Sequence, residues 1–109
     1  MPEVKTNVFP VFLDADAVAV TADDETFEVT ASRVTLNGAA SCDIILDNAK
    51  EIGTVVRFEA ITSVANNPTV QATTGFSETI TFDTIGDTAT CMYFDGGWRV
   101  IANDGCSIS

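Results

Sequence analysis

Apolar and polar residues alternate along most of this chain, and the alternation breaks about every 8–12 residues, which is typical of an all-β domain. In Glu78-Thr79-Ile80-Thr81-Phe82, the side chains of Ile80 and Phe82 fall on one face, as in a half-buried strand. Helical periodicity is hard to find. The pattern predicts strands over residues 8–13, 17–22, 26–30, 33–36, 42–46, 54–61, 69–72, 78–82, 88–94 and 98–101.

The breaks carry residues that favour turns. Asn37-Gly38 is a strong hairpin signal because both residues tolerate a positive φ, and residues 23–25 form a polar turn. Residues 46–53 predict one helical turn at most. Near the end, residues 95–97 (Asp-Gly-Gly) predict a closing hairpin with the only Trp at the start of the returning strand. We therefore expect a single domain, a small antiparallel β-sandwich of the jelly-roll kind.

The N-terminal segment differs from the rest. Residues 8–13 are apolar apart from the interruption at Pro10, which restricts the segment to an edge strand or an extended arm. We divide the chain into an N-terminal arm or edge strand at 1–13 and a sandwich at 14–109. The arm either serves as a plain edge strand or lies on a neighbouring chain.

The strand at 88–94 is apolar on both faces. Ala89, Cys91 and Tyr93 share one face, and Met92 and Phe94 share the other. Because both faces are expected to be covered, the strand is either central in its sheet or part of a subunit interface.

The 109 residues suit one domain. With 16 acidic against five basic residues the net charge is −11, which disfavours nucleic acid and anionic lipid as partners. The charge either suits a basic protein surface or serves only solubility. No apolar run reaches the ~18 residues of a membrane helix, and the N-terminus lacks a secretory pattern, so we expect synthesis in a cytoplasm.

Residues able to perform catalysis or to bind metal are few. The chain has no His, which excludes the usual Ser-His-Asp and Cys-His arrangements, and it has no phosphate-binding glycine motif. The pair Asp14 and Asp16 lacks the Gly and distal Glu of a calcium loop. Three cysteines form neither a disulfide framework nor a zinc motif, although Cys106 leaves a disulfide between chains open. We expect no enzymatic activity and no cofactor or metal.

The stretch 52–101 resembles a known family. It holds Gly53-Thr54-Val55-Val56, a threonine-rich middle, and an ending that runs from Gly86-Asp87-Thr88 to Asp95-Gly96-Gly97-Trp98-Arg99-Val100-Ile101. These motifs resemble a small β-rich module of tailed-bacteriophage virion proteins, which forms trimers in fibres and in capsid decoration (cement) proteins. Cys91 stands where the family usually has Leu. A free-standing chain of this length looks more like a decoration protein than a fibre.

The resemblance implies a structural virion protein. The chain is expected to bind the outer capsid surface as a homotrimer, with the major capsid protein as its partner. The candidates for the trimer seam or the core are Cys91, Met92, Tyr93, Phe94 and Trp98. The candidates for capsid contact are Val8, Phe9, Val11 and Phe12.

The alternative is a tail- or head-fibre component, or its tip, that binds a host surface glycan through Trp98, Tyr93 and Arg99. Trp98 separates the two hypotheses, because a glycan-binding Trp is exposed whereas a Trp in a core or seam packs inward. For Arg99, a solvated position and an ion pair across subunits both remain open.

Overall fold

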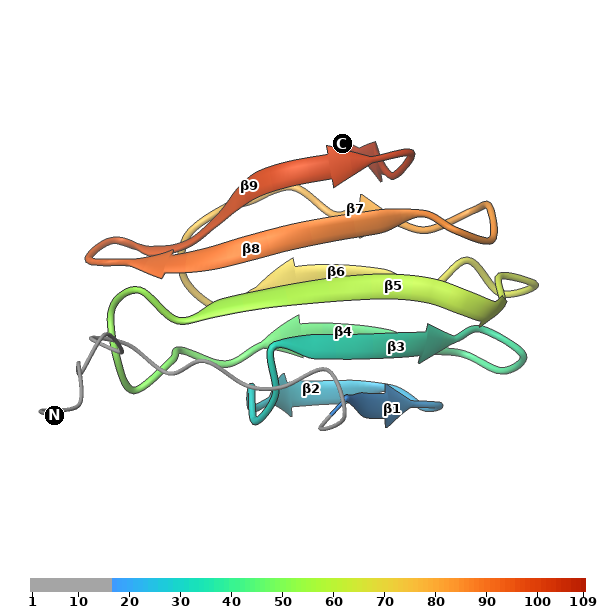
Figure 1. Cartoon of the computed structure of the whole chain (residues 1–109), viewed down its shortest axis with the longest axis horizontal. Coiled ribbons are helices and arrows are strands. Elements are labelled where there is room, and N and C mark those ends of the chain that lie inside the picture. Colours follow the sequence, from blue (N-terminus) through green and yellow to red (C-terminus); the bar gives the residue numbers. More distant parts are fainter. Residues whose placement is uncertain (1–16) are drawn as a thin grey trace, which may run out of the picture.

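Two five-stranded sheets packed face to face make up the computed structural model, which describes residues 17–109 (Figure 1). Sheet A has the order β1-β3-β5-β8-β9, and sheet B has the order β10-β7-β6-β4-β2. The strands are β1 (Val18–Val20), β2 (Asp24–Phe27), β3 (Arg33–Asn37), β4 (Asp43–Leu46), β5 (Val55–Ser63), β6 (Thr69–Ala72), β7 (Ile80–Thr81), β8 (Thr88–Phe94), β9 (Gly97–Asp104) and β10 (Ser107–Ile108).

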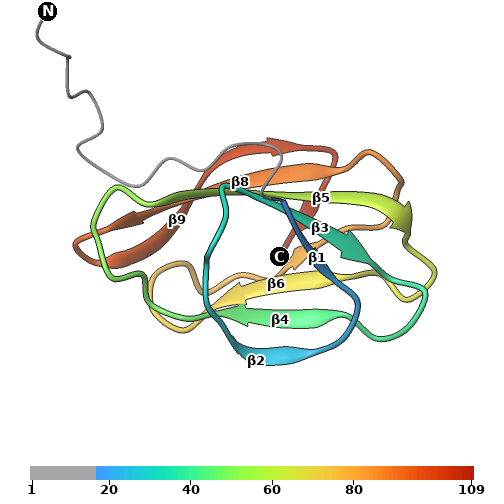
Figure 2. The same cartoon turned by 60° about the horizontal axis from the view of Figure 1, so that its bottom comes forward.

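The first six strands alternate between the two sheets, so the chain winds as three stacked coils (Figure 2). Each coil places one strand in sheet A and the next in sheet B. Neighbours within a sheet therefore run in the same direction, with Val34 beside both Val18 and Phe58, and Ile44 beside Val70. From β7 onward the strands pair antiparallel, while the isolated bridges Gly75–Trp98 and Thr88–Gly105 are parallel.

The all-β, two-sheet sandwich predicted from the pattern is confirmed, but its antiparallel, jelly-roll-like path is wrong. Four of the eight strand pairings are parallel. The turns after β1 and β3 carry the chain across to the other sheet instead of back along the same one. Neither Asn37 nor Gly38 has a positive φ. A Cβ on Gly38 would lie 2.7 Å from Pro68 Cδ, so glycine is needed there for close packing.

Several other predicted elements differ from the observed ones in their bounds or are absent. The strand expected at 26–30 lies at Asp24–Phe27, and the short β10 was not predicted. The helical turn expected at 46–53 is absent, because Leu46 ends β4 and residues 47–53 form a loop that closes with a bend and a turn. The strand and arm expected within 1–13 lie outside the described residues. No helix in the described part is long and apolar enough to cross a membrane.

The core lies between the sheets, where alternate residues of each strand point inward. Phe58 of β5 and Phe27 of β2 meet across it with ring centroids 6.3 Å apart. Full burial of such side chains contributes about 1.5–3 kcal/mol each, which makes this layer the main source of stability. The fully buried apolar side chains include Val34, Leu36, Ile44, Leu46, Val56, Phe58, Val70, Ile80, Phe82, Cys91 and Trp98.

Candidate functional site at the open edge of the sandwich

The β8–β9 hairpin forms one edge of the molecule and begins with a tight glycine turn. Phe94 pairs with Gly97, so Asp95 and Gly96 make the two-residue loop. Gly97 has a φ of 113°, and its Cα packs directly against the backbone of Thr74. A side chain at Gly97 would be strained and would also clash, so the glycine fixes where β9 begins.

Trp98 anchors the start of β9 and has no solvent exposure. Its Nε1–H donates a hydrogen bond of 2.8 Å to the carbonyl oxygen of Asp47, in the loop after β4. Its ring meets the ring of Tyr93 edge-on, with centroids 5.2 Å apart. The indole therefore joins the hairpin of sheet A to a loop of sheet B.

The backbone of Trp98 holds a further segment on the outer side of β9. Its N–H donates to the carbonyl oxygen of Thr74 at 2.8 Å, and its carbonyl oxygen accepts from the N–H of Phe76 at 2.9 Å. Gly75, whose φ is 123°, lies against the backbone of Trp98 where no side chain would fit. Residues 74–76 thus cover the first part of this edge.

The covered part of the edge ends after Trp98. Because alternate residues of an antiparallel strand point their backbone groups to the same side, the N–H and C=O of Val100 face the side that 74–76 occupies at Trp98. Among the described residues, no backbone group outside the sheet pairs with Val100. The outer edge of β9 is therefore unpaired at Val100, and directly after it the register of β9 against β8 shifts by one residue, at Ile101.

The far end of β9 is anchored by the turn that follows it. The side chain of Asn103 accepts a hydrogen bond from the N–H of Cys106 at 2.9 Å and donates one to its carbonyl oxygen at 3.0 Å. Gly105 packs against the buried carboxylate of Asp87, which also accepts hydrogen bonds from the N–H groups of Asp83 and Thr84. The strand is fixed at both ends, and its middle pairs with β8 on one side and with no strand on the other.

A groove of about 440 Å³ lies beside this unpaired stretch, and we call it the edge groove. Its lining combines apolar side chains with one acid and one base. The residues that line it are Gly75, Phe76, Glu78, Gly96, Trp98, Arg99, Val100 and Ile108. Ile108 is 39% exposed, and Ile101, the next residue of β9, is 50% exposed. Such a combination suits an extended, mainly apolar peptide.

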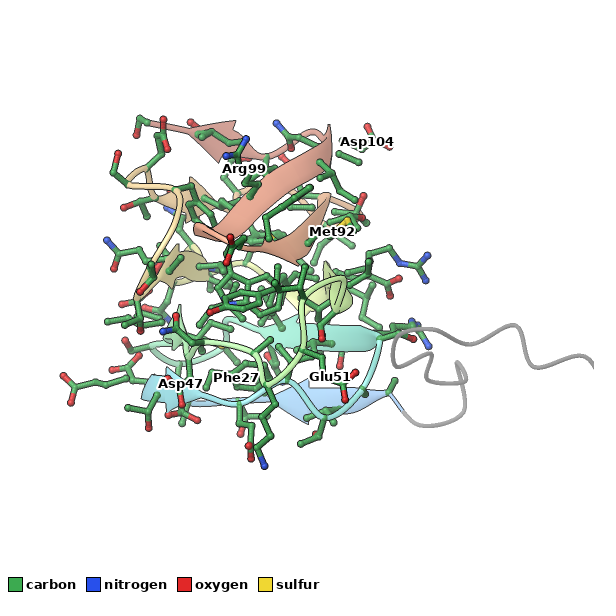
Figure 3. The ribbon with its side chains drawn as sticks, turned by 90° about the vertical axis from the view of Figure 1, so that its left-hand side faces the viewer. Phe27, Asp47, Glu51, Met92, Arg99 and Asp104 are labelled. Carbon is green, nitrogen blue, oxygen red and sulfur yellow. The ribbon has the colours of Figure 1, made fainter. Side chains whose placement is uncertain are left out.

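Arg99 is placed by the aromatic ring at the end of β8. Its guanidinium carbon lies 5.3 Å from the ring centroid of Phe94, within the range of a cation–π contact. Figure 3 shows Arg99 and Asp104, both from β9, at the upper edge of the molecule, while Phe27 and Asp47 lie near the lower one. Arg99 is exposed, so its charge is available at the mouth of the edge groove.

The five residues predicted for a seam or core separate into two groups. Cys91 and Trp98 are fully buried between the sheets, and Tyr93 packs against that core. Met92 and Phe94 are half-buried, and their alternation with the inward residues places them on the outer face of sheet A. Figure 3 shows Met92 on that side of the molecule. The four candidates for capsid contact at Val8, Phe9, Val11 and Phe12 lie outside the described residues.

The sequence reading missed Phe76, Glu78 and Ile108. Phe76 stands alone among polar residues, and Ile108 lies in a two-residue strand, so neither belongs to a periodic pattern. The only available signal was the alternation of apolar and polar residues in Cys106-Ser107-Ile108-Ser109, which is too short to predict a strand.

The three cysteines are unpaired and buried. Burial raises the pKa of the Cys91 thiol to about 12. Burial, with the carboxylates of Asp87, Asp83 and Asp104, raises the pKa of Cys106 to about 12 as well. At neutral pH both thiols are protonated, and the thiolate needed for rapid oxidation is scarce. A disulfide between chains at Cys106 would require this end of β9 to open.

A charged cluster lies on the outer face of sheet A. The carboxylate of Glu59 accepts hydrogen bonds from Arg33 Nε at 2.8 Å and Arg57 Nε at 2.6 Å. Burial acts to raise the pKa of Glu59, but the hydrogen bonds from both arginines outweigh it and lower that pKa below its ordinary value. The cluster joins β3 to β5 within one sheet.

A second hollow, of about 380 Å³, lies among the loops that follow β2 and β4. An exposed ion pair of 3.7 Å joins Lys50 and Glu28 there, and Glu51 and Thr54 add further polar groups. In the described part of the chain, no group of three or more His, Cys, Asp or Glu side chains is placed to hold a metal ion.

Fold and site together define a mixed β-sandwich with a pre-formed open edge. No protein-family model matches the chain, and no curated protein matches it. One similar solved structure is described as "Crystal structure of enterohemorrhagic E. coli StcE(132-251)". It is 18% identical, with a TM-score of 0.46, and the match covers 72% of this chain and 89% of that chain. At this TM-score the likeness carries no argument about function.

Proposed function

We propose that this chain is a structural virion protein, a capsid decoration (cement) protein of a tailed bacteriophage. It is made in the host cytoplasm, binds the outer capsid surface as a homotrimer, and stabilises the shell through contacts with the major capsid protein. The motifs of residues 52–101 suggest this class, as described above.

The observation that carries the proposal is the open edge of β9. An edge strand with unpaired backbone groups favours pairing with another chain, and natural monomers usually shorten, charge or cover such edges. Here the strand is eight residues long, residues 74–76 cover only its start, and the exposed side chains of Ile101 on the strand and Ile108 at the groove add apolar surface. A surface of this kind suits a protein that works in contact with other protein chains.

The charge distribution supports a basic protein surface as partner. At the start of β4, Asp43 accepts a hydrogen bond from the Thr69 hydroxyl at 2.8 Å, and in the loop before β2, Asp23 accepts one from Ser41 at 2.8 Å. These hydrogen bonds hold the exposed carboxylates in fixed positions, and those from the Asp43 backbone and Ser41 lower the pKa of Asp23. Ordered negative charge steers association with a positively charged surface.

Nothing in the described structure favours the fibre-tip alternative. That reading needs an aromatic ring on which a sugar can stack, and the indole of Trp98 has no exposed surface and already uses its N–H. We therefore keep decoration as the single proposal.

The test is to mix the purified protein with phage particles that lack it and to image them by electron microscopy. We expect regular density over the capsid surface and a higher temperature of shell rupture than in undecorated particles. Density confined to the tail or to one vertex, or no added density, would contradict the proposal. Raising the salt concentration should weaken the binding, because exposed charges are screened.

A further inference from the structure

We infer that the edge groove receives residues 8–13 of a neighbouring copy of this chain, which add a strand to β9. The inference rests on the homotrimer of the proposed function, and it identifies the contact that holds neighbouring subunits of that trimer together. It assigns the apolar side chains of that segment to a partner copy rather than to the capsid.

The acceptor is a short piece of pre-formed strand. Residues 74–76 already pair with β9 at Trp98, and the next backbone groups that face the same way belong to Val100. An incoming strand would lie beside β9 on the same side as residues 74–76 and would begin where their pairing with β9 ends. Since β9 is anchored at Trp98 and again at Asn103, binding requires little ordering of the acceptor.

The walls of the groove select an apolar strand with charged flanks. Phe76, Val100 and Ile108 offer apolar surface, and Glu78 and Arg99 stand on the same lining with opposite charges. The N-terminal segment offers apolar residues over 8–13, preceded by Glu3 and Lys5. The negative and the positive charge that precede the apolar donor segment thus each have an opposite charge on the lining of the groove.

Pro10 restricts how the donor pairs. It has no N–H, so it is compatible with an added strand only where its backbone faces away from β9. The backbone groups of Phe9 and Val11 then face β9, because alternate residues of a strand point their groups to opposite sides. Only one side of the segment can therefore form a full set of backbone hydrogen bonds. Such a segment can be added to the open edge of a sheet, but it cannot be inserted between two strands.

The position of the donor favours a neighbouring copy over the same copy. Residues 1–16 lead into β1, and β1 lies at the opposite edge of sheet A from β9 (Figure 1). Contact from one edge of a molecule to the other edge of the next is head-to-tail, and such contacts form a ring where the rotation between copies closes. A trimer is one such ring, so one exchanged strand per subunit accounts for it.

The length of the segment is sufficient. Sixteen residues extend over roughly 50 Å, whereas the five strands of sheet A span about 20 Å at ~4.8 Å between neighbours. The segment is long enough to leave its own domain and reach the next one. It is also long enough to fold back on its own β9, and the experiment separates these cases.

The direct test is a disulfide between donor and acceptor in the full-length chain. In Phe9→Cys/Ile108→Cys, mild oxidation should give covalent dimers and trimers on a non-reducing gel. The control is Phe9→Cys/Ile85→Cys, because Ile85 is similarly exposed (52%) but lies in the turn between β7 and β8, outside the edge groove. A crosslink within one chain only, no crosslink, or equal crosslinking in the control would overturn the inference.

A second measurement uses oligomeric state without new cysteines. Light scattering should find that Ile108→Lys weakens trimer formation at least tenfold, while Ile85→Lys leaves it unchanged. If Ile108→Lys forms trimers over the same range of protein concentrations as the wild type, the inference is wrong, but the proposed decoration function is not contradicted. Conversely, a trimer that depends on Ile108 but does not bind particles would overturn decoration alone. A wild-type chain that stays monomeric would overturn both the inference and the proposed homotrimer.

Discussion

The two lateral edges of this sandwich are built differently. At the edge formed by β1 and β2, the strands are three and four residues long, and the sequence around them is acidic at Asp23, Asp24 and Glu25. At the other edge, β9 is eight residues long, and Ile101 on it is half exposed. The first edge has short strands with acidic residues around them, which discourages pairing, whereas the second has a long strand that combines the charges of Arg99 and Asp104 with exposed apolar surface.

The difference follows from how each edge is made. The first edge is the end of three parallel coils, in which successive strands change sheets, and the two strands at this end have only three and four residues. The second edge is a hairpin, whose strands are held by local pairing and by Trp98, so a long strand remains stable with one side unpaired. A single domain can therefore combine one edge that discourages strand pairing with another that favours it.

The largest expected effect comes from removing the anchor of the open edge. Trp98→Ala deletes a fully buried ring and its hydrogen bond to Asp47, and we expect a loss of about 3–5 kcal/mol in the free energy of unfolding. Urea denaturation followed by circular dichroism measures it. Trp98→Phe should lose less, because it keeps most of the packing. Near-wild-type stability of Trp98→Ala would show that the indole does not anchor this edge.

A smaller effect is expected from the glycine that begins β9. Gly97→Ala places a side chain at a φ of 113° and against the backbone of Thr74, so we expect the free energy of unfolding to fall by about 1–3 kcal/mol, as for strained backbone positions. Gly96→Ala is the matched control: its φ is not positive, and a Cβ there meets no atom within 4 Å. If thermal denaturation finds the two variants equally stable, the close approach at Gly97 does not matter.

The smallest effect concerns the parallel coils and depends on pH. Because its pKa is lowered in the folded chain, Glu59 adds stability above its unfolded pKa near 4.5, and this contribution is lost as the pH falls through the lower folded value. We expect Glu59→Gln to cost about 1 kcal/mol at pH 7, since the side chains of Arg33 and Arg57 remain 29% and 46% exposed and water screens the pairs.

The measurement for Glu59→Gln is the free energy of unfolding across pH 3–7. The gap between wild type and Glu59→Gln should narrow below about pH 4.5. A gap that is constant with pH would mean that the arginines do not stabilise the charged form of Glu59.

The alternating pattern was sufficient for much of the fold. It predicted strands within one or two residues for β3 and β6, and it predicted a hairpin turn at residues 95–97, of which Gly97 already belongs to β9. These features depend on short-range physics, namely the period of two and the few residues that tolerate tight turns. The coils escaped detection because the loops between them differ in length, so no repeat is visible in the sequence.

The edge groove was beyond the reach of the sequence. It brings together Phe76 and Ile108 with Arg99 from separate strands and loops, and only their packing makes them neighbours. The same limit applies to the direction of pairing at Asn37-Gly38, where the residues of a hairpin turn lead instead to the opposite sheet.

By itself, the sequence determined that this chain forms short strands, that two sheets must share an apolar layer, and that Trp98 lies near the start of the last long strand. The tertiary structure alone decided which strands are neighbours and which edge stays open. The reason is that side-chain alternation specifies which face of a strand is buried, whereas its edges are completed by backbone hydrogen bonds, which are the same for every residue type except proline.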